Sequence, residues 1–275
     1  MRGSFRCMVG FLFLVLLLLM SLLVACGEPV ATPESVFIQV AGSTSMVQLA
    51  SDLAVAFVEQ TPTVSIDVVG QGTCFGLNEL VAGRADIALA AWLPDDLDEQ
   101  WRAAAVARDG VAIIVHRSNS VEGVGLLQLQ DLFSGRIHEW TGVGDAKFRG
   151  EVQVVSREEG SGMRDAFETL VMGEKGVTSL AVVAPSSEAV LEYIANHEAA
   201  VGYVSMGVVT PAVKVLSVEG ELPTVQTVRE GSYPLSHELW FVAAQSPETT
   251  VRYFLRFAQG PAGQQIVGRY FGRIQ

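Results

Sequence analysis

The sequence predicts an α/β protein built mainly on parallel sheets. Short apolar runs rich in β-branched residues alternate with segments whose apolar residues recur at helical spacing. Hydrophobic residues make up 49% of the 275 positions, enough to bury the core of one large domain or two lobes. The predicted strands are residues 36–40, 64–69, 87–91, 111–115, 152–155, 180–183, 200–204, 213–216 and 238–243.

Helical stripes follow several of these strands. One stripe consists of Met46, Leu49, Ala50, Leu53 and Phe57. A second consists of Met163, Ala166, Phe167, Leu170 and Val171. Near the C-terminus, Pro261 occupies the first turn of a last helix, where its missing N–H costs nothing.

The first residues read as a targeting segment rather than as part of the fold. Arg2 and Arg6 precede an apolar run over residues 8–25, which is typical of a secretory signal. The run is also long enough to span a bilayer, so an uncleaved anchor is the alternative. Because residues 23–26, Leu-Val-Ala-Cys, resemble a bacterial lipobox, we expect a signal peptide over 1–25, a lipid on Cys26 and a tether over 26–35.

Charge and cysteine content limit the partners. The formal net charge of −12 becomes −14 when the two arginines of the leader are removed. Such acidity argues against binding nucleic acid or an anionic membrane surface, but it does not exclude a small anion held by local donors. Cys7 lies in the leader and Cys26 would carry lipid, so only Cys74 remains and no intrachain disulfide is expected.

Three junctions share one arrangement of strand, polar turn and helix. We call the polar segments the first turn (41–45, AGSTS), the second turn (70–76, GQGTCFG) and the third turn (157–162, REEGSG). Each places hydroxyls and unpaired backbone N–H groups at the carboxyl end of a strand, where α/β sheets bind ligands and helix N-termini attract anions. A plain capped turn explains any one of them, whereas three that converge predict an oxyanion site.

The same residues resemble the PstS-type phosphate-binding lipoproteins, the solute-binding components of phosphate ABC importers. The resemblance runs from about Val36 to the C-terminus. It is carried by residues 42–44 (GST), 72–77 (GTCFGL), 85–87 (ADI), Arg157, 160–164 (GSGMR), 202–207 (GYVSMG) and 233–236 (YPLS).

This resemblance implies a type II periplasmic-binding-protein fold, in which two α/β lobes joined by a hinge close on a ligand in the cleft between them. Lobe 1 would combine residues 36–112 with 209–275, and lobe 2 would cover 113–208. The ligand-binding residues implied by the resemblance are Thr44, Ser45, Thr73, Arg157, Ser161 and Gly162.

The implied function is capture of phosphate or a related tetrahedral oxyanion for an ABC transporter permease. The protein would be a monomeric lipoprotein anchored on the outer side of a bacterial membrane, facing the periplasm or the cell surface. It would have no catalytic residue, no cofactor, no metal and no nucleic-acid partner.

Two positions depart from the family pattern. Ala91 stands where an aspartate usually accepts the proton of phosphate, and Met163 replaces a threonine hydroxyl. Losing the acceptor removes the main basis for preferring phosphate over sulfate. The alternative function is therefore a sensor or scaffold lipoprotein of the same fold whose anion pocket is altered or lost.

Other interpretations remain for individual residues. Arg157 beside two glutamates is also typical of a surface ion pair, and Thr73 and Ser161 are also typical helix caps. Cys74 at a helix start raises the possibility of thiol chemistry, but no histidine or other general base adjoins it in sequence. The histidines are scattered without metal spacing and are expected to be structural.

Overall fold

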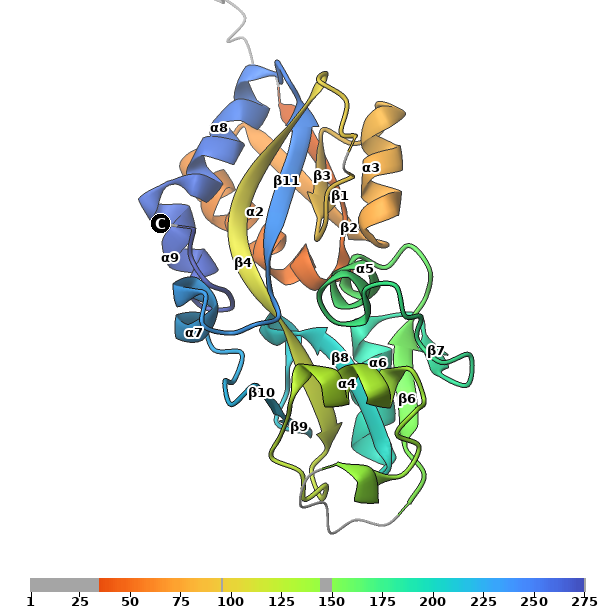
Figure 1. The fold of residues 1–275 in the computed structure, drawn as a ribbon. Helices are drawn as coiled ribbons and strands as arrows, with labels where there is room; N and C mark the ends of the chain where they lie inside the picture. The colour runs from red at the N-terminus through yellow and green to blue at the C-terminus, as the bar shows by residue number, and fades with distance from the viewer. Residues whose placement is uncertain (1–34, 95, 144–149, 275) are drawn as a thin grey trace, which may run out of the picture. The chain divides into compact units, whose positions relative to one another are not determined.

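Parallel groups of strands flank an antiparallel centre in one large sheet (Figure 1). The computed structural model describes residues 35–94, 96–143 and 150–274. The sheet has nine strands in the order β2-β1-β3-β11-β4-β8-β6-β7, with β9 paired to β4, and β5 and β10 form a separate pair. The strands are β1 Val36–Gly42, β2 Val64–Gly70, β3 Ile87–Ala90, β4 Trp101–His116, β5 Gly123–Val124, β6 Gln153–Arg157, β7 Val182–Ala184, β8 Ala200–Ser205, β9 Val213–Val215, β10 Ser217–Val218 and β11 Ser236–Ala244.

The helices alternate with the strands, so the predicted α/β class is confirmed. They are α2 Val47–Gln60, α3 Thr73–Val81, α4 Leu126–Phe133, α5 Gly162–Phe167, α6 Ser187–Asn196, α7 Val225–Glu230, α8 Thr249–Gln259 and α9 Pro261–Val267. Short 3₁₀ turns cover Thr44–Met46, Trp140–Gly142 and Met206–Val208, and a π-helical turn, Glu168–Met172, continues α5. Pro261 begins α9 as predicted.

Strand β4 is the longest element of the sheet and changes partner along its length. Its first part runs antiparallel to β11 as far as Gly110, and from Val111 it runs antiparallel to β8. The sequence predicted only residues 111–115 as strand. The preceding part is rich in alanine, which has low strand propensity, and pairing with β11 decides its conformation instead.

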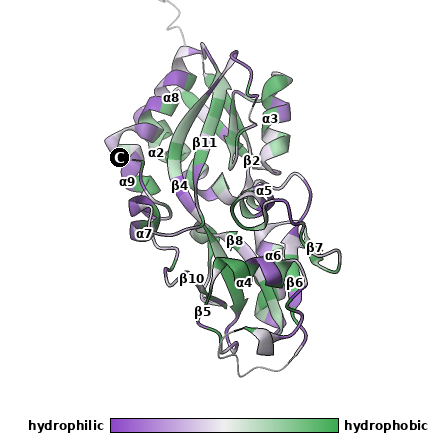
Figure 2. Ribbon diagram, viewed as in Figure 1, coloured by the Kyte–Doolittle hydropathy of each residue, from purple (hydrophilic) through white to green (hydrophobic). Residues whose placement is uncertain are grey.

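Two large hydrophobic clusters lie on either side of the point where β4 changes partner. The first joins side chains of β1, α2, β3, β11, α8 and α9, and the second joins side chains of β4 after Gly110, α4, α5 and β8. Figure 2 shows the corresponding hydrophobic strands at the centre of the fold. In β3 every residue is buried, because α2 and α8 cover one face and α3 the other.

The division into two lobes stays a proposal. Side chains between residues 213 and 235, among them Leu216, Val228 and Tyr233, pack in the second cluster. A division by packing would therefore assign this segment to lobe 2, whereas the sequence placed 209–275 in lobe 1. The predicted signal peptide, Cys26 and most of the tether lie outside the described residues.

Candidate functional site

The first and second turns meet at the carboxyl ends of two adjacent parallel strands. Gly42 and Gly70 are paired at the ends of β1 and β2, and the Gly42 carbonyl accepts hydrogen bonds from the N–H groups of Gln71 and Gly72, both at 2.9 Å. Gly42 has a φ of 146°, and a Cβ there would lie 2.2 Å from the Leu89 carbonyl oxygen. Only glycine fits this close approach, so the GST sequence reflects backbone geometry as well as its hydroxyls.

Thr44 and Ser45 follow directly in the first turn. Ser45 is buried, and its Oγ lies 3.0 Å from Ser43 Oγ. Thr44 is half-buried and lies against the end of β2, since a Cβ on Gly70 would be 3.6 Å from Thr44 Cγ2. The first turn is therefore in contact with the second through Thr44.

The second and third turns are also in contact. Thr73 is fully buried at the start of α3, and its Oγ1 accepts a hydrogen bond from the Ala91 N–H at 3.2 Å. A Cβ on Gly162 would lie 2.2 Å from Thr73 Oγ1, and one on Gly72 would lie 3.2 Å from the Gly160 carbonyl oxygen. The structure thus brings Thr73 of the second turn against Gly162 of the third, whereas Thr44 of the first turn lies beside Gly70 of the second.

Ser161 begins α5 but makes no side-chain capping bond there. It is 2% exposed. The alternative in which Ser161 serves only as a helix cap finds no hydrogen bond to support it. Its hydroxyl remains available for a ligand.

Arg157 is 1% exposed, so it is not a surface residue. It does form an ion pair: Nε and Nη2 donate to both carboxylate oxygens of Glu158, at 2.8 and 2.7 Å, and Nη1 donates to Ser187 Oγ at 3.2 Å. Arg164 donates to Glu168 and to the Arg157 carbonyl oxygen, which ties α5 to β6. An anion that reaches Arg157 must therefore share the guanidinium with Glu158.

The two departures from the family pattern lie in different surroundings. Ala91 is 2% exposed and belongs to the contact, since its Cβ would be 2.9 Å from one on Gly162. Met163 packs in the second hydrophobic cluster. The carboxylate that the family pattern expects at position 91 is therefore absent from the contact between the turns. At position 163 the expected threonine hydroxyl is replaced by a methionine side chain that packs in the core.

One carboxyl group, that of Asp165, and one thiol, that of Cys74, have shifted pKa values beside this contact. Burial, followed by the charge of Glu168, raises the pKa of Asp165, although Arg164 and the Trp92 indole oppose the shift. Burial, followed by the charge of Asp165, raises the pKa of the Cys74 thiol. A thiol with a raised pKa is a poor nucleophile near neutral pH.

Two residues near the contact were not assigned to it from the sequence. The His237 ring nitrogen Nδ1 lies 3.1 Å from the Ala91 carbonyl oxygen, although the sequence treated this histidine only as structural. Trp92 and His237 line a cavity of about 270 Å³ that α5 and the π-helical turn also border. The place of His237 beside Ala91 depends on the pairing of β11 with β3, which the sequence pattern does not reveal.

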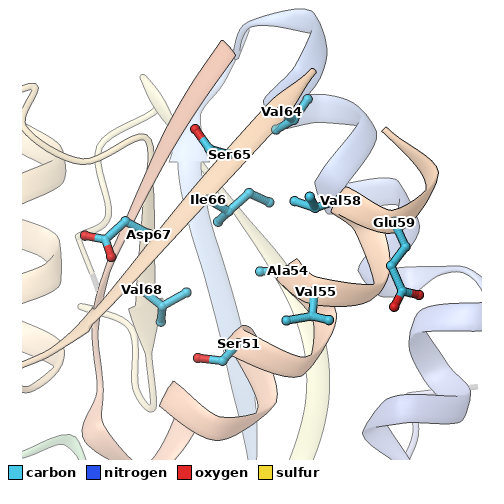
Figure 3. Close-up of a pocket in the computed structure, with 10 residues that line it drawn as sticks. All are labelled: Ser51, Ala54, Val55, Val58, Glu59, Val64, Ser65, Ile66, Asp67 and Val68. Carbon is cyan, nitrogen blue, oxygen red and sulfur yellow. The ribbon is translucent and has the colours of Figure 1, made fainter. Parts of the chain in front are cut away.

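A cavity of about 610 Å³ lies elsewhere, between α2 and β2 (Figure 3). Valines, Ala54 and Ile66 form most of its wall, whereas the Asp67 carboxylate points to the other side of β2. No residue of the three turns lines it. An apolar wall offers no hydrogen-bond donors for an anion.

Metal and membrane features were searched in the same described ranges. Over these ranges, no group of three or more His, Cys, Asp or Glu side chains is placed to hold a metal ion. None of the helices in this part of the chain combines the length and the apolar character needed to cross a membrane.

Comparison with known proteins agrees with this geometry. A family model described as a PBP superfamily domain matches residues 28–261. A Clostridium perfringens protein described as a phosphate ABC transporter substrate-binding protein, solved with bound phosphate, is 28% identical with a TM-score of 0.81. That match covers 87% of this chain and all of that one. An ABC-type phosphate transport receptor from Vibrio cholerae is also 28% identical, with a TM-score of 0.73, and covers 86% of this chain and 99% of that one.

Sequence relatives point the same way. Phosphate-binding protein PstS 2 of Streptococcus pneumoniae is 33% identical over 126 residues, so the match spans 43% of this chain and 43% of that protein. Phosphate-binding protein PstS of Bacillus subtilis is 26% identical over 206 residues, which cover 71% of this chain and 66% of that protein. The resemblance to PstS-type proteins is confirmed. Because the family match covers most of the chain, this protein is a member of the PBP superfamily.

Proposed function

We propose that the protein captures phosphate or a related tetrahedral oxyanion and delivers it to an ABC importer. The observation that carries this proposal is the contact of the second turn with the third at Thr73 and Gly162. Thr44, which lies beside Gly70 of the second turn, and its neighbour Ser45 are proposed to complete the site from the first turn. A tetrahedral anion has four oxygens, and donors that converge from separate loops suit it better than a single turn does.

The donor orientation at Thr73 supports the same function. Because Thr73 Oγ1 accepts a hydrogen bond from the Ala91 N–H, its own proton is free to be donated. Ser161, whose hydroxyl caps no helix, offers a second such donor. Neutral donors of this kind bind an anion even in a strongly acidic chain, because local dipoles govern a buried site.

We expect the site to discriminate only weakly between phosphate and sulfate. Without a carboxylate at Ala91, no group at that position accepts the proton of monohydrogen phosphate or repels sulfate. We therefore propose the class of tetrahedral oxyanions, with phosphate as the physiological ligand by analogy with the relatives named above. The alternative, a sensor or scaffold without an anion site, predicts no binding.

Binding without catalysis is part of the proposal. Cys74 is the one cysteine of the described residues, and burial raises the pKa of its thiol. No histidine contacts it in the described part of the chain. A thiol in this setting lacks the base that nucleophilic catalysis requires.

Isothermal titration with phosphate, sulfate, arsenate and molybdate tests the proposed function. We expect binding of phosphate and measurable binding of sulfate, and we expect both to be lost in Thr73→Val, which keeps the side-chain shape but has no hydroxyl. Thr178→Val, at a half-buried threonine outside the three turns, is the matched control. Absence of binding to all four anions at millimolar concentration would refute the proposal and favour the alternative.

The anchoring part of the proposal is tested separately. We propose a lipid on Cys26, outward exposure and a monomeric protein that docks on a permease. Mass spectrometry of the membrane-associated protein should find a lipid-modified Cys26 at the N-terminus. An unmodified residue preceded by the intact leader would instead identify an uncleaved anchor.

A further inference from the structure

Asp109 is a fully buried carboxylate at the point where β4 changes partner. Its Oδ1 accepts hydrogen bonds from the N–H groups of Gly110, at 2.7 Å, and Met206, at 3.2 Å. Its Oδ2 is buried without a hydrogen-bond partner among the described residues. A half-satisfied buried carboxylate is costly, which calls for an explanation of its second oxygen.

His237 faces that second oxygen. It stands opposite Asp109 in the β11–β4 ladder, and its Nε2 lies 3.7 Å from Asp109 Oδ2, likewise without a hydrogen bond in the described structure. Its Nδ1 lies 3.1 Å from the Ala91 carbonyl oxygen and 3.3 Å from that of Glu238. Because both oxygens only accept, Nδ1 carries the ring proton, and Nε2 is free to accept one from Asp109.

A continuous series of contacts leads from this pair to the anion site. His237 holds the carbonyl of Ala91, and the N–H of the same residue donates to Thr73 Oγ1 at 3.2 Å. Thr73 in turn lies against Gly162 in the third turn. The orientation of the Thr73 hydroxyl therefore depends on a residue that His237 fixes.

Burial of Asp109 and His237 favours a single proton between the two groups near neutral pH. Burial raises the pKa of Asp109 to about 7, although the nearby Ser205 hydroxyl and the N–H groups of Gly110 and Met206 oppose the shift. Burial lowers the pKa of His237 to about 4, although the Glu238 and Ala91 carbonyls oppose it. The remaining titratable group that senses Asp109 is Tyr233, whose own pKa is raised by burial and by the Asp109 charge.

We propose that Asp109 and His237 form a dyad that shares one proton and positions Ala91, whose carbonyl contacts His237 and whose N–H donates to Thr73, and thereby orients the Thr73 hydroxyl for the anion. The inference rests on the proposed function and adds two positioning residues to it. While Asp109 holds the proton, that proton faces His237 Nε2 across 3.7 Å and the buried pair carries no charge. When the proton leaves, an uncompensated carboxylate faces the bare Nε2, which disturbs the contact of His237 with Ala91 and disfavours a nearby anion.

The pH dependence of binding tests the proposal. Asp109→Asn imitates the protonated carboxyl, because its amide keeps an acceptor for Gly110 and Met206 and donates to His237. The dissociation constant for phosphate is measured for wild type and Asp109→Asn at each pH. The ratio between them cancels the titration of phosphate itself. We expect the wild-type dissociation constant, divided by that of Asp109→Asn, to rise by about tenfold as the pH increases past the Asp109 pKa. Only the wild type loses the dyad proton over this interval.

A second variant tests positioning directly. His237→Phe keeps a ring but removes both nitrogens, and we expect phosphate binding to weaken by about tenfold, the value of one well-oriented hydrogen bond. His237→Gln, whose amide can donate to Ala91, should recover part of this loss. His138→Phe, at an exposed histidine, is the control and should bind as the wild type does.

Hydrogen exchange separates this inference from the proposed function. The Ala91 amide should exchange faster in His237→Phe than in wild type, whether or not any anion binds. A wild type that binds no anion but shows this difference would refute the proposed function alone. Unchanged phosphate affinity in His237→Phe, a ratio independent of pH, or unchanged exchange at Ala91 would overturn the dyad.

Discussion

The Thr73 hydroxyl oxygen lies 2.2 Å from the point that a Cβ on Gly162 would occupy, so the turn after β2 abuts the turn after β6. Glycine at 162 is required by this contact rather than by an unusual backbone angle, because no positive φ is found there. The proposed anion site and the contact between the turns therefore depend on the same two residues.

Gly162→Ala should separate the second and third turns. The added methyl would overlap Thr73 Oγ1 and crowd Ala91, and such overpacking typically costs about 1–3 kcal/mol. We expect a lower free energy of unfolding by urea and phosphate binding weakened by more than about tenfold. Gly176→Ala, at an exposed glycine with nothing within 4 Å of the added methyl, should change neither measurement.

Glu158→Gln should strengthen anion binding. Glu158 accepts from Nε and Nη2 along one edge of the Arg157 guanidinium, and a neutral amide competes less strongly than a carboxylate for those donors. We expect phosphate affinity to rise several-fold, while the free energy of unfolding falls by about 1 kcal/mol because the charge-assisted hydrogen bonds are weakened. Titration calorimetry decides, with Glu159→Gln, an exposed neighbour, as control. Unchanged affinity would indicate that Arg157 does not reach the anion.

Ala91→Asp should restore discrimination between phosphate and sulfate. A carboxylate at this position accepts the proton of phosphate and repels sulfate, so the ratio of sulfate to phosphate dissociation constants should rise by at least about tenfold. Because Ala91 is buried, the variant should also unfold at a lower temperature. Ala82→Asp, at an exposed alanine after α3, should leave the ratio unchanged. An unchanged ratio in Ala91→Asp would mean that this position does not face the ligand.

Asp109 and His237 should give opposite pH dependences of stability when studied singly. A raised carboxyl pKa contributes stability at low pH that is lost as the pH rises toward about 7, whereas a lowered imidazole pKa contributes stability that is lost as the pH falls toward about 4. The two effects oppose each other in the wild type, because over this interval the folded and unfolded pair each hold one proton.

Each single variant reveals the pH dependence of the free energy of unfolding that its remaining titratable group causes. In His237→Phe the free energy of unfolding should fall with rising pH by up to about 1.4 kcal/mol per pH unit, and in Asp109→Asn it should fall with decreasing pH. Urea unfolding across the interval measures both. Slopes of the same sign in the two variants would contradict the assignment.

Cys74 should react slowly with alkylating agents. Burial and the nearby Asp165 raise the pKa of its thiol, so little thiolate forms at neutral pH. Iodoacetamide labelling followed by peptide mass spectrometry should be slower at Cys74 than in an unfolded peptide of the same sequence. Asp165→Asn should speed the reaction by lowering the thiol pKa. Labelling faster than that of the peptide would reopen the possibility of thiol chemistry.

The sequence by itself determined the local structure of this protein and the chemistry of its three turns. The apolar runs of β1 and β2 and the helical stripe from Met46 to Phe57 have the residue spacing of a strand and of a one-sided helix. This spacing predicts the type of each element without coordinates. The GST and GSG segments likewise indicated turns that carry hydroxyls and unpaired backbone amides, because glycine and serine favour turns at the end of a strand.

Only the tertiary structure decided which of these pieces meet. The pairing of β4 with β11 joins residues more than a hundred positions apart and sets Asp109 opposite His237, and the pairing of β11 with β3 brings His237 to Ala91. The burial of Arg157 on Glu158 and the departure of Met163 into the core depend on packing in the same way. Periodicity records which face of an element is apolar, but it does not record which other face will cover it, because that choice is made by long-range contacts.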